Sequence, residues 1–197
     1  MRQTITKILK ESAAVKLATA ERLSPEIEEA AKRIIVAFRA GGKLVLFGNG
    51  GSAADAQHIA TELVHQFEKK RPALHAMVLH GNTSAMTSIG NDWGFDEVYA
   101  RQIEGIATKK DVVIAISTSG NSANIIRGIE EAKRKGSYVI GFSNQDGGKM
   151  KGLLDLAILV PATNTARVQE CHITIGHILC KLIEDELFPE AGGKIAP

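Results

Sequence analysis

The chain has 197 residues, of which 44% are apolar and 23% charged, a composition typical of one globular domain with a sizeable core. Its 24 basic and 22 acidic residues leave a net charge of +2, which argues against nucleic acid or an anionic membrane as a main partner. No apolar run approaches the roughly 20 residues of a membrane-spanning helix, and no signal peptide opens the chain. We therefore expect a cytoplasmic protein in which Cys171 and Cys180 are buried free thiols.

The first 42 residues are expected to form two helices ahead of the main fold. Apolar residues recur at helical spacing in Thr4–Ala20. Ser24-Pro25-Glu26 has the pattern of a second helix start, with a cap hydroxyl followed by proline, and this helix should run to about Phe38. Residues 1–42 are more than an α/β core requires, so we expect them to mediate oligomerisation.

From residue 43 onward, short apolar runs alternate with helical patterns. The expected strands are Lys43–Phe47, Ala73–Leu79, Val112–Ile116, Ser137–Phe142 and Leu156–Val160. The expected helices are Ser52–Phe67, Thr83–Gly90, Phe95–Ala107, Ser122–Lys135 and Thr165–Leu187. This alternation predicts an α/β fold: a three-layer α-β-α sandwich around a five-stranded parallel, doubly wound sheet. Residues 1–197 would form a single domain with its core at 43–190, and Gly192-Gly193-Lys194 would be a loose tail.

Two of the expected strands end in turns rich in glycine and small polar residues. The first turn is Gly48-Asn49-Gly50-Gly51-Ser52 and the second is Ser117-Thr118-Ser119-Gly120-Asn121-Ser122. Each precedes a helical pattern, so backbone N–H groups and the positive end of a helix dipole can face an anion. Ligands of doubly wound sheets bind at the carboxyl ends of the strands. We expect the hydroxyls of the second turn to bind a phosphate, and Asn49, Gly51 and Ser52 to bind sugar or phosphate oxygens.

Two nucleotide-binding interpretations are disfavoured. Gly48, Gly50 and Ala53 fit the G-x-G-x-x-A dinucleotide fingerprint, but the next strand ends at His80-Gly81-Asn82 without the acid that would hold a ribose. No lysine follows the second turn at the spacing of a nucleoside triphosphate loop. Asn91-Asp92 is typical of a turn, although at a strand's carboxyl end the pair could bond sugar hydroxyls.

Residues with metal-ligand chemistry occur on two of the expected helices. His58 and Glu62 are four positions apart, and Gln169 and His177 are eight apart, so each pair shares one helix face. Two imidazoles, a carboxylate and an amide oxygen make a plausible four-ligand Zn²⁺ site. A solvated pair of side chains on one helix is the simpler alternative. Two further histidines are not excluded as ligands, His65 and His172.

The whole series of motifs resembles the phosphoheptose isomerases, single-domain members of the sugar isomerase (SIS) family, over nearly the entire chain. The motifs that carry the resemblance are Gly48–Ser52, His58…Glu62, Gly90-Asn91-Asp92, Ser117–Ser122, Asp146-Gly147-Gly148 and Gln169-Glu170…His177. The resemblance implies a homotetramer with active sites at subunit boundaries. It implies conversion of sedoheptulose 7-phosphate to D-glycero-D-manno-heptose 7-phosphate, which starts the route to nucleotide-activated heptose for lipopolysaccharide core or surface glycans.

The resemblance also implies particular site residues. It implies one Zn²⁺ per subunit, held by His58, Glu62, Gln169 and His177. The implied substrate contacts are Asn49, Gly50, Gly51, Glu62, Asn91, Asp92, Ser117, Thr118, Ser119, Ser122 and Gln169. Some relatives carry an acid shortly before Gln169, where this chain has Ala166-Arg167-Val168, so no role of that acid can be transferred.

Aldose–ketose isomerisation fits these residue types. The reaction moves a proton between C1 and C2 through an enediol, which needs a base at one carbon and an acid at the oxygens. Glu62 is the candidate base and His177 its acid/base partner, and a metal ion would polarise the carbonyl. Because Glu62 cannot be a tight ligand and a free base at once, substrate binding is expected to alter its coordination.

Three alternatives stay open at this point. A non-catalytic SIS-fold protein that binds the bacterial replication initiator is expected to lack residues that match Glu62 and His177, and this chain has both. A regulatory SIS domain that senses a sugar phosphate usually accompanies another module, for which the chain has no room. An isomerase for a pentose or hexose phosphate is poorly distinguished by sequence, because sugar length is read by cavity depth.

Overall fold

The computed structural model describes residues 1–189, so the predicted tail Gly192-Gly193-Lys194 lies outside the described residues. Its centre is a five-stranded sheet of β1 (Leu44–Gly48), β2 (Ala76–Val78), β3 (Val112–Ile116), β4 (Tyr138–Asn144) and β5 (Leu156–Val160). The strand order is β2-β1-β3-β4-β5 and every neighbouring pair is parallel. The predicted doubly wound parallel sheet is therefore confirmed.

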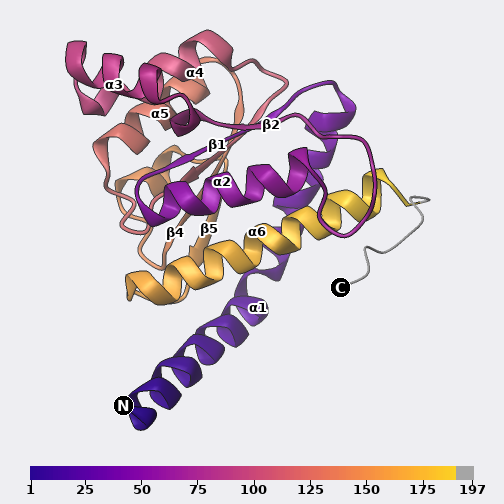
Figure 1. The fold of residues 1–197 in the computed structure, drawn as a ribbon, viewed down its shortest axis with the longest axis vertical. Coiled ribbons are helices and arrows are strands. Elements are labelled where there is room, and N and C mark those ends of the chain that lie inside the picture. The colour runs from indigo at the N-terminus through magenta and orange to yellow at the C-terminus, as the bar shows by residue number, and fades with distance from the viewer. Residues whose placement is uncertain (190–197) are drawn as a thin grey trace.

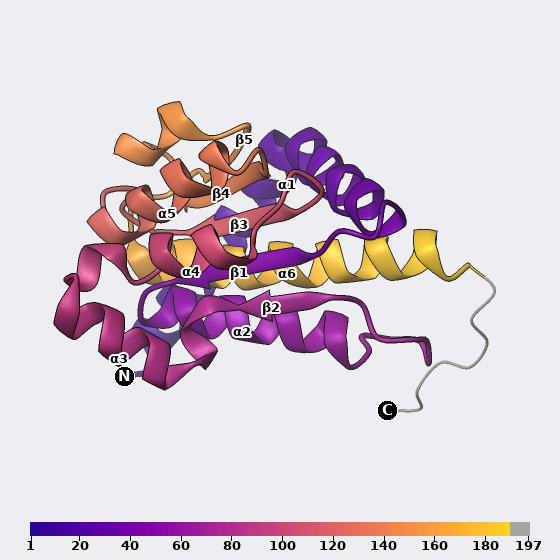
Figure 2. The same cartoon turned by 90° about the horizontal axis from the view of Figure 1, so that it is seen from above.

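Helices cover both faces of this sheet (Figures 1 and 2). They are α1 (Arg2–Arg39), α2 (Gly51–Val64), α3 (Thr83–Asp92), α4 (Ala100–Ile106), α5 (Ala123–Arg134) and α6 (Thr165–Leu187), with short 3₁₀ turns at η1 (Leu79–Gly81), η2 (Phe95–Glu97) and η3 (Lys149–Leu153). Among residues 1–189, no helix combines the length and the apolar character needed to cross a bilayer.

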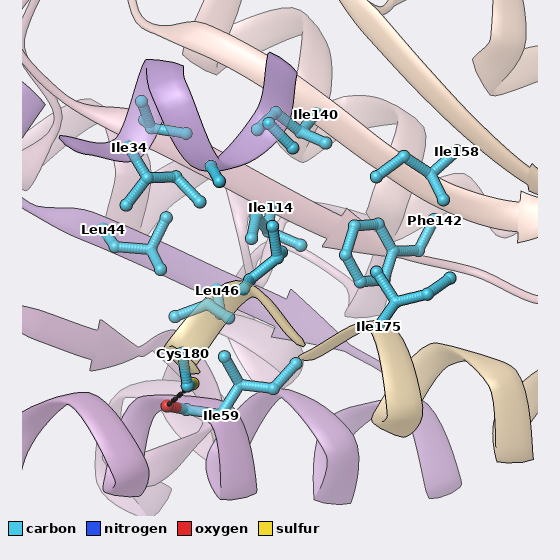
Figure 3. Packing of buried hydrophobic residues seen from close by; sticks show 14 of the residues in the cluster. Ile34, Leu44, Leu46, Ile59, Ile114, Ile140, Phe142, Ile158, Ile175 and Cys180 are labelled. Carbon is cyan, nitrogen blue, oxygen red and sulfur yellow. Dashed lines mark hydrogen bonds between the residues drawn. The ribbon is translucent and has the colours of Figure 1, made fainter. Parts of the chain in front are cut away.

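Side chains of alternate residues in the strands pack into two separate hydrophobic clusters, one on each face of the sheet. Leu44 and Leu46 of β1 belong to the larger cluster, which contains the apolar faces of α1, α2 and α6 (Figure 3). Val45 and Phe47 of the same strand belong to the second cluster, with α4 and α5. Strands buried on both faces read as continuous apolar runs, which is why these short segments were predictable.

The two helices predicted for residues 1–42 are instead one continuous helix, α1, of 38 residues with Pro25 inside it. Ser24 does not cap a second helix, because its hydroxyl donates to the Ala20 carbonyl of the same helix. Proline removes one backbone donor, and position 25 is exposed, so the freed carbonyl can bond water. Buried residues continue in helical register through the proline, from Leu23 to Ile27, and this packing outweighs the break. Figure 1 shows the first half of α1 extending away from the rest of the chain.

Three further elements differ clearly from their predicted bounds. The helix predicted at Ser52–Phe67 ends at Val64. The strand predicted at Ala73–Leu79 is ordered as a strand only over Ala76–Val78, because Leu79 begins the η1 turn. The helix predicted at Phe95–Ala107 is divided into η2 and α4.

The strand order reverses direction between β1 and β3, because β2 lies on one side of β1 and β3, β4 and β5 lie on the other. In the β1–β3 register Gly48 is opposite Ile116, so the turns that follow these two residues leave the sheet side by side. Crevices at such a reversal are where open α/β sheets bind ligands. The fold therefore brings both predicted phosphate- and sugar-binding turns to one place.

Candidate active site

The first turn is fixed by a network that sequence reasoning missed. The side-chain amides of Asn49 and Asn124 exchange two hydrogen bonds of 2.9 Å, which join the first turn to the start of α5. The buried Tyr99 hydroxyl donates to the Gly48 carbonyl at 2.5 Å. Burial raises the pKa of Tyr99 to about 12, so the phenol remains a donor at neutral pH. Ser52, a predicted ligand contact, is only 3% exposed and supports the turn from within.

Gly51 begins α2 and lies directly against Gln169 of α6. A Cβ at position 51 would be 2.5 Å from Gln169 Nε2, closer than any ordinary contact. Glycine at this position thus lets the Gln169 amide, a predicted zinc and substrate ligand, approach the N-terminus of α2.

Two of the four hydroxyls of the second turn lie close together. Ser117 Oγ accepts from the Gly120 N–H at 3.2 Å and lies 3.5 Å from Ser122 Oγ. Thr118 is half-buried and Ser119 is exposed, so the turn has both a fixed base and an accessible rim. Gly120 has φ +65°, and a Cβ there would lie 2.1 Å from the Gly147 carbonyl oxygen, so only glycine fits.

His172 is not a candidate metal ligand, because it lies buried behind the second turn. Its Nε2 is 3.3 Å from the Ser143 carbonyl oxygen, and the Ser143 hydroxyl donates to the Ser117 carbonyl at 2.7 Å. Burial lowers the pKa of His172 to about 4, so the ring is neutral at physiological pH. The residue therefore braces the turn from α6. His65, the other open candidate, is exposed just after α2 ends.

Three of the four predicted zinc ligands meet between α2 and α6. His58 Nε2 is 3.2 Å from Glu62 Oε1 on its own helix and 3.1 Å from His177 Nε2 on α6. The His58 side chain is 48% exposed and that of Glu62 is 25% exposed, so the group faces solvent and is reachable. The pair on α2 is not isolated, because His58 also contacts His177, 119 positions away on α6.

The residue types and pair distances fit Zn²⁺. Ligand atoms of a tetrahedral zinc site lie roughly 3.3 Å apart when each bond is about 2.0–2.1 Å. The three side chains do not converge on one point, however: within residues 1–189 no three His, Cys, Asp or Glu side chains form a ready metal-binding group. Metal binding would thus require these side chains to move from the positions described.

Asp55 lies one turn before His58 on α2. Among residues 1–189, no hydrogen-bond partner reaches its buried Oδ2. Burial raises the pKa of Asp55 to about 6, while the nearby His58 acts in the opposite direction.

The turn expected at Asn91-Asp92 is helical instead. The two residues form the last turn of α3, where both are exposed and Asn91 Nδ2 donates to Asp92 Oδ1 at 2.6 Å. The apolar positions of α3 extend the helix through them, which overrides their turn propensity.

Comparisons with known proteins agree on one family. A family model for the SIS domain matches residues 9–144. A phosphoheptose isomerase from Aquifex aeolicus is 48% identical over 94% of this chain and 97% of its own length. The phosphoheptose isomerase of Nitratiruptor sp. is 54% identical over 84% of this chain and 88% of its own length. Among solved structures, the Neisseria gonorrhoeae phosphoheptose isomerase GmhA is 37% identical, with a TM-score of 0.89 over 93% of this chain and 98% of that chain.

Proposed function

The chain belongs to the phosphoheptose isomerase family of SIS-domain proteins, and from this we propose that it converts sedoheptulose 7-phosphate to D-glycero-D-manno-heptose 7-phosphate. Each relative reported above carries the same isomerase name, so none of them favours the initiator-binding or sensing alternatives. The reaction would supply heptose for a surface glycan such as lipopolysaccharide core.

The reaction moves one hydrogen and needs no external oxidant or reductant. A base removes a proton from C1 of the ketose, and the C2 carbonyl oxygen is protonated to give an enediol. Return of a proton to C2 and loss of one from the C1 oxygen then leave an aldehyde. We assign the base to Glu62 and the proton exchange at the oxygens to His177, because the two side chains belong to one solvent-accessible group.

The residues that would hold Zn²⁺ are His58, Glu62, Gln169 and His177. When bound, the ion would polarise the sugar carbonyl and stabilise negative charge on the enediol oxygens. Of these four residues, Gln169 is the one whose amide packs against the first turn, at Gly51.

The phosphate is assigned to the second turn, at Ser117, Thr118, Ser119 and Ser122. The turn precedes α5, whose N-terminus adds a favourable dipole for an anion. Asn49, Gly50 and Gly51 of the first turn would hold the sugar hydroxyls between the phosphate and the reacting carbons. Binding energy at the phosphate would thus position C1 and C2 for proton transfer.

A single observation carries this assignment: His58 Nε2 lies within 3.2 Å of both Glu62 and His177, which belong to different helices. A carboxylate and an imidazole that share a partner suit general acid–base chemistry.

We further propose a cytoplasmic homotetramer. Apolar side chains are exposed on α1 and α6, including Leu17 at 68%, Val36 at 62% and Ile178 at 41%. The same two helices line a cavity of about 430 Å³. Exposed apolar area of this kind is typical of subunit contacts, and the free buried thiols Cys171 and Cys180 suit a reducing compartment. Light scattering on the purified protein tests the tetramer.

Turnover of sedoheptulose 7-phosphate tests the function, with the aldose product identified by NMR. Glu62→Gln should abolish turnover, because the amide cannot accept the C1 proton. The matched control is Glu68→Gln, which neutralises an exposed carboxylate just beyond α2. A chelator followed by added Zn²⁺ tests the metal separately. Saturable phosphosugar binding without turnover in the wild-type protein would contradict the proposed function while leaving the phosphate-binding assignment intact.

A further inference from the structure

A fully buried carboxylate on α6 holds the loop that follows α2. Glu184 is 0% exposed. It accepts hydrogen bonds from the backbone N–H groups of Phe67, Glu68 and Lys69 at 3.1, 2.7 and 2.9 Å. It also accepts from Arg71 Nε at 3.0 Å. One side chain thus fixes three consecutive backbone groups and one buried cation.

The Arg71 guanidinium continues this network to the end of α2. Its side chain is 0% exposed, and it donates to the backbone carbonyls of Glu62 at 2.9 Å and Leu63 at 2.7 Å. These carbonyls belong to the last turn of the helix, where no intrahelical donor is available. A cation here also suits the negative end of the helix dipole. Arg71 therefore holds the backbone of the proposed base itself.

The same loop contacts the proposed acid. The Phe67 ring lies 5.6 Å from the His177 ring, measured between centroids, and the Phe67 N–H is one of the donors to Glu184. Glu62 and His177 are thus both tied to one buried ion pair, the first through the backbone and the second through an aromatic contact.

We propose that Arg71 and Glu184 are positioning residues that hold Glu62 and His177 at the separation needed for proton transfer. Stability alone is a weak explanation, because a buried ion pair is often no more stabilising than well-packed apolar residues of similar volume. This pair is distinguished by its hydrogen bonds to the backbone: Arg71 donates to the Glu62 carbonyl, and Glu184 accepts from the N–H of Phe67, whose ring contacts His177. The expected effect on kcat rests on the proposed function, and the expected effect on Zn²⁺ affinity rests on the proposed zinc ligands.

Arg71→Lys tests the proposal with little change in charge. The ammonium group can keep the ion pair with Glu184, but a single nitrogen cannot reproduce the fork that reaches two carbonyls. The matched control is Lys69→Met, which removes an ion pair with Asp185 from the same loop without touching the Glu62 carbonyl. Both variants are compared with the wild-type protein by circular dichroism, so that rates refer to folded molecules.

The expected result for Arg71→Lys is a kcat at least tenfold below that of Lys69→Met, with KM for the phosphosugar unchanged within about twofold. Titration of each chelator-treated protein with Zn²⁺ alone should show weaker binding in Arg71→Lys than in Lys69→Met. Loss of folded protein would also lower the apparent kcat without changing KM, so each kcat is divided by the folded fraction from circular dichroism, and the Zn²⁺ affinity provides a second readout that does not depend on that fraction. Equal kcat and equal Zn²⁺ affinity in the two variants would overturn the proposal. A third outcome separates the two proposals. If the wild-type protein does not turn over the substrate but Arg71→Lys still binds Zn²⁺ more weakly than Lys69→Met, the isomerase function is overturned and the positioning role is supported.

Discussion

Gly176 sets the distance between the two helices that carry the proposed proton-transfer groups. A Cβ at this position of α6 would lie 2.5 Å from Ile59 Cγ1 and 2.6 Å from Ile59 Cδ1 on α2. Ile59 is 1% exposed and packed in the main cluster (Figure 3), so it has no solvent-filled space to enter. Because Gly176 precedes His177 and Ile59 follows His58, any separation at this contact separates the two imidazoles.

The size of the effect of Gly176→Ala follows from these distances. Ordinary carbon contacts begin near 3.5 Å, so the helices must move apart by roughly 1 Å. Overpacking of this kind costs about 1–3 kcal/mol, against which alanine regains about 1 kcal/mol of helix propensity. The free energy of unfolding should therefore fall by only about 0–2 kcal/mol. A displacement of about 1 Å at reacting groups, by contrast, can lower the rate about 100-fold.

The assay is kcat and KM on sedoheptulose 7-phosphate, measured beside the thermal unfolding midpoint. Gly176→Ala should lose about two orders of magnitude in kcat while it remains folded. Ile59→Ala removes both clashing atoms, so the double variant Gly176→Ala, Ile59→Ala should recover much of this loss despite its own cavity. Retention of kcat within twofold in Gly176→Ala would refute the argument that this helix separation controls catalysis.

Three further outcomes are expected. Gly120→Ala should raise KM at least tenfold and weaken binding of inorganic phosphate, because its methyl group would collide with the Gly147 carbonyl; an unchanged KM would contradict the phosphate assignment. Burial opposes ionisation of Asp111, but hydrogen bonds from Lys43 and Thr108 outweigh it and hold the pKa of Asp111 below its ordinary value. The ionised Asp111 thus stabilises the folded protein fully above about pH 4, and this stabilisation is lost as pH falls through the folded-state pKa. The difference in melting temperature between the wild-type protein and Asp111→Asn should therefore shrink in acid. Burial raises the pKa of Asp55 to about 6, so this carboxyl lowers stability progressively as pH rises from about 4 to about 6, and by a constant amount above that. Asp55→Asn in chelator should therefore raise the melting temperature more at pH 8 than at pH 4.5.

The parts of the site predicted from sequence are those with local signals. Apolar runs of five residues followed by glycine- and serine-rich segments identified β1, β3 and the turn after each of them. The pairing of His58 with Glu62 was also local, because helical spacing alone brings them to one face. The prediction that a residue of α6 lies near His58 and Glu62 was not local, because His58 and His177 are 119 positions apart. The 3.1 Å contact between these two histidines confirms that the two helices meet there.

The unpredicted parts are single polar residues whose partners are distant in sequence. Asn49 and Asn124 are separated by 75 positions and Arg71 and Glu184 by 113, and neither pair has a periodic pattern. Their pairing depends on the side-by-side placement of elements, which only the folded chain reveals. Pro25 is the opposite case. Its local sequence predicts a helix start, but packing on either side of it keeps α1 continuous.

The contacts between α2 and α6 suggest that proton transfer and phosphate binding depend on different parts of the structure, which kinetic measurements can test. The helices run side by side (Figure 1) and touch at Gly51 with Gln169, at Ile59 with Gly176, and through Arg71 with Glu184. Each contact lies beside a proposed proton-transfer or zinc residue, whereas the serine turn is bonded to β4 and is backed by His172 near the start of α6. Substitutions along this helix pair should therefore lower kcat and leave KM nearly unchanged, while substitutions in the serine turn should mainly raise KM. A helix-pair variant that raised KM alone would show that the two functions are not structurally separate.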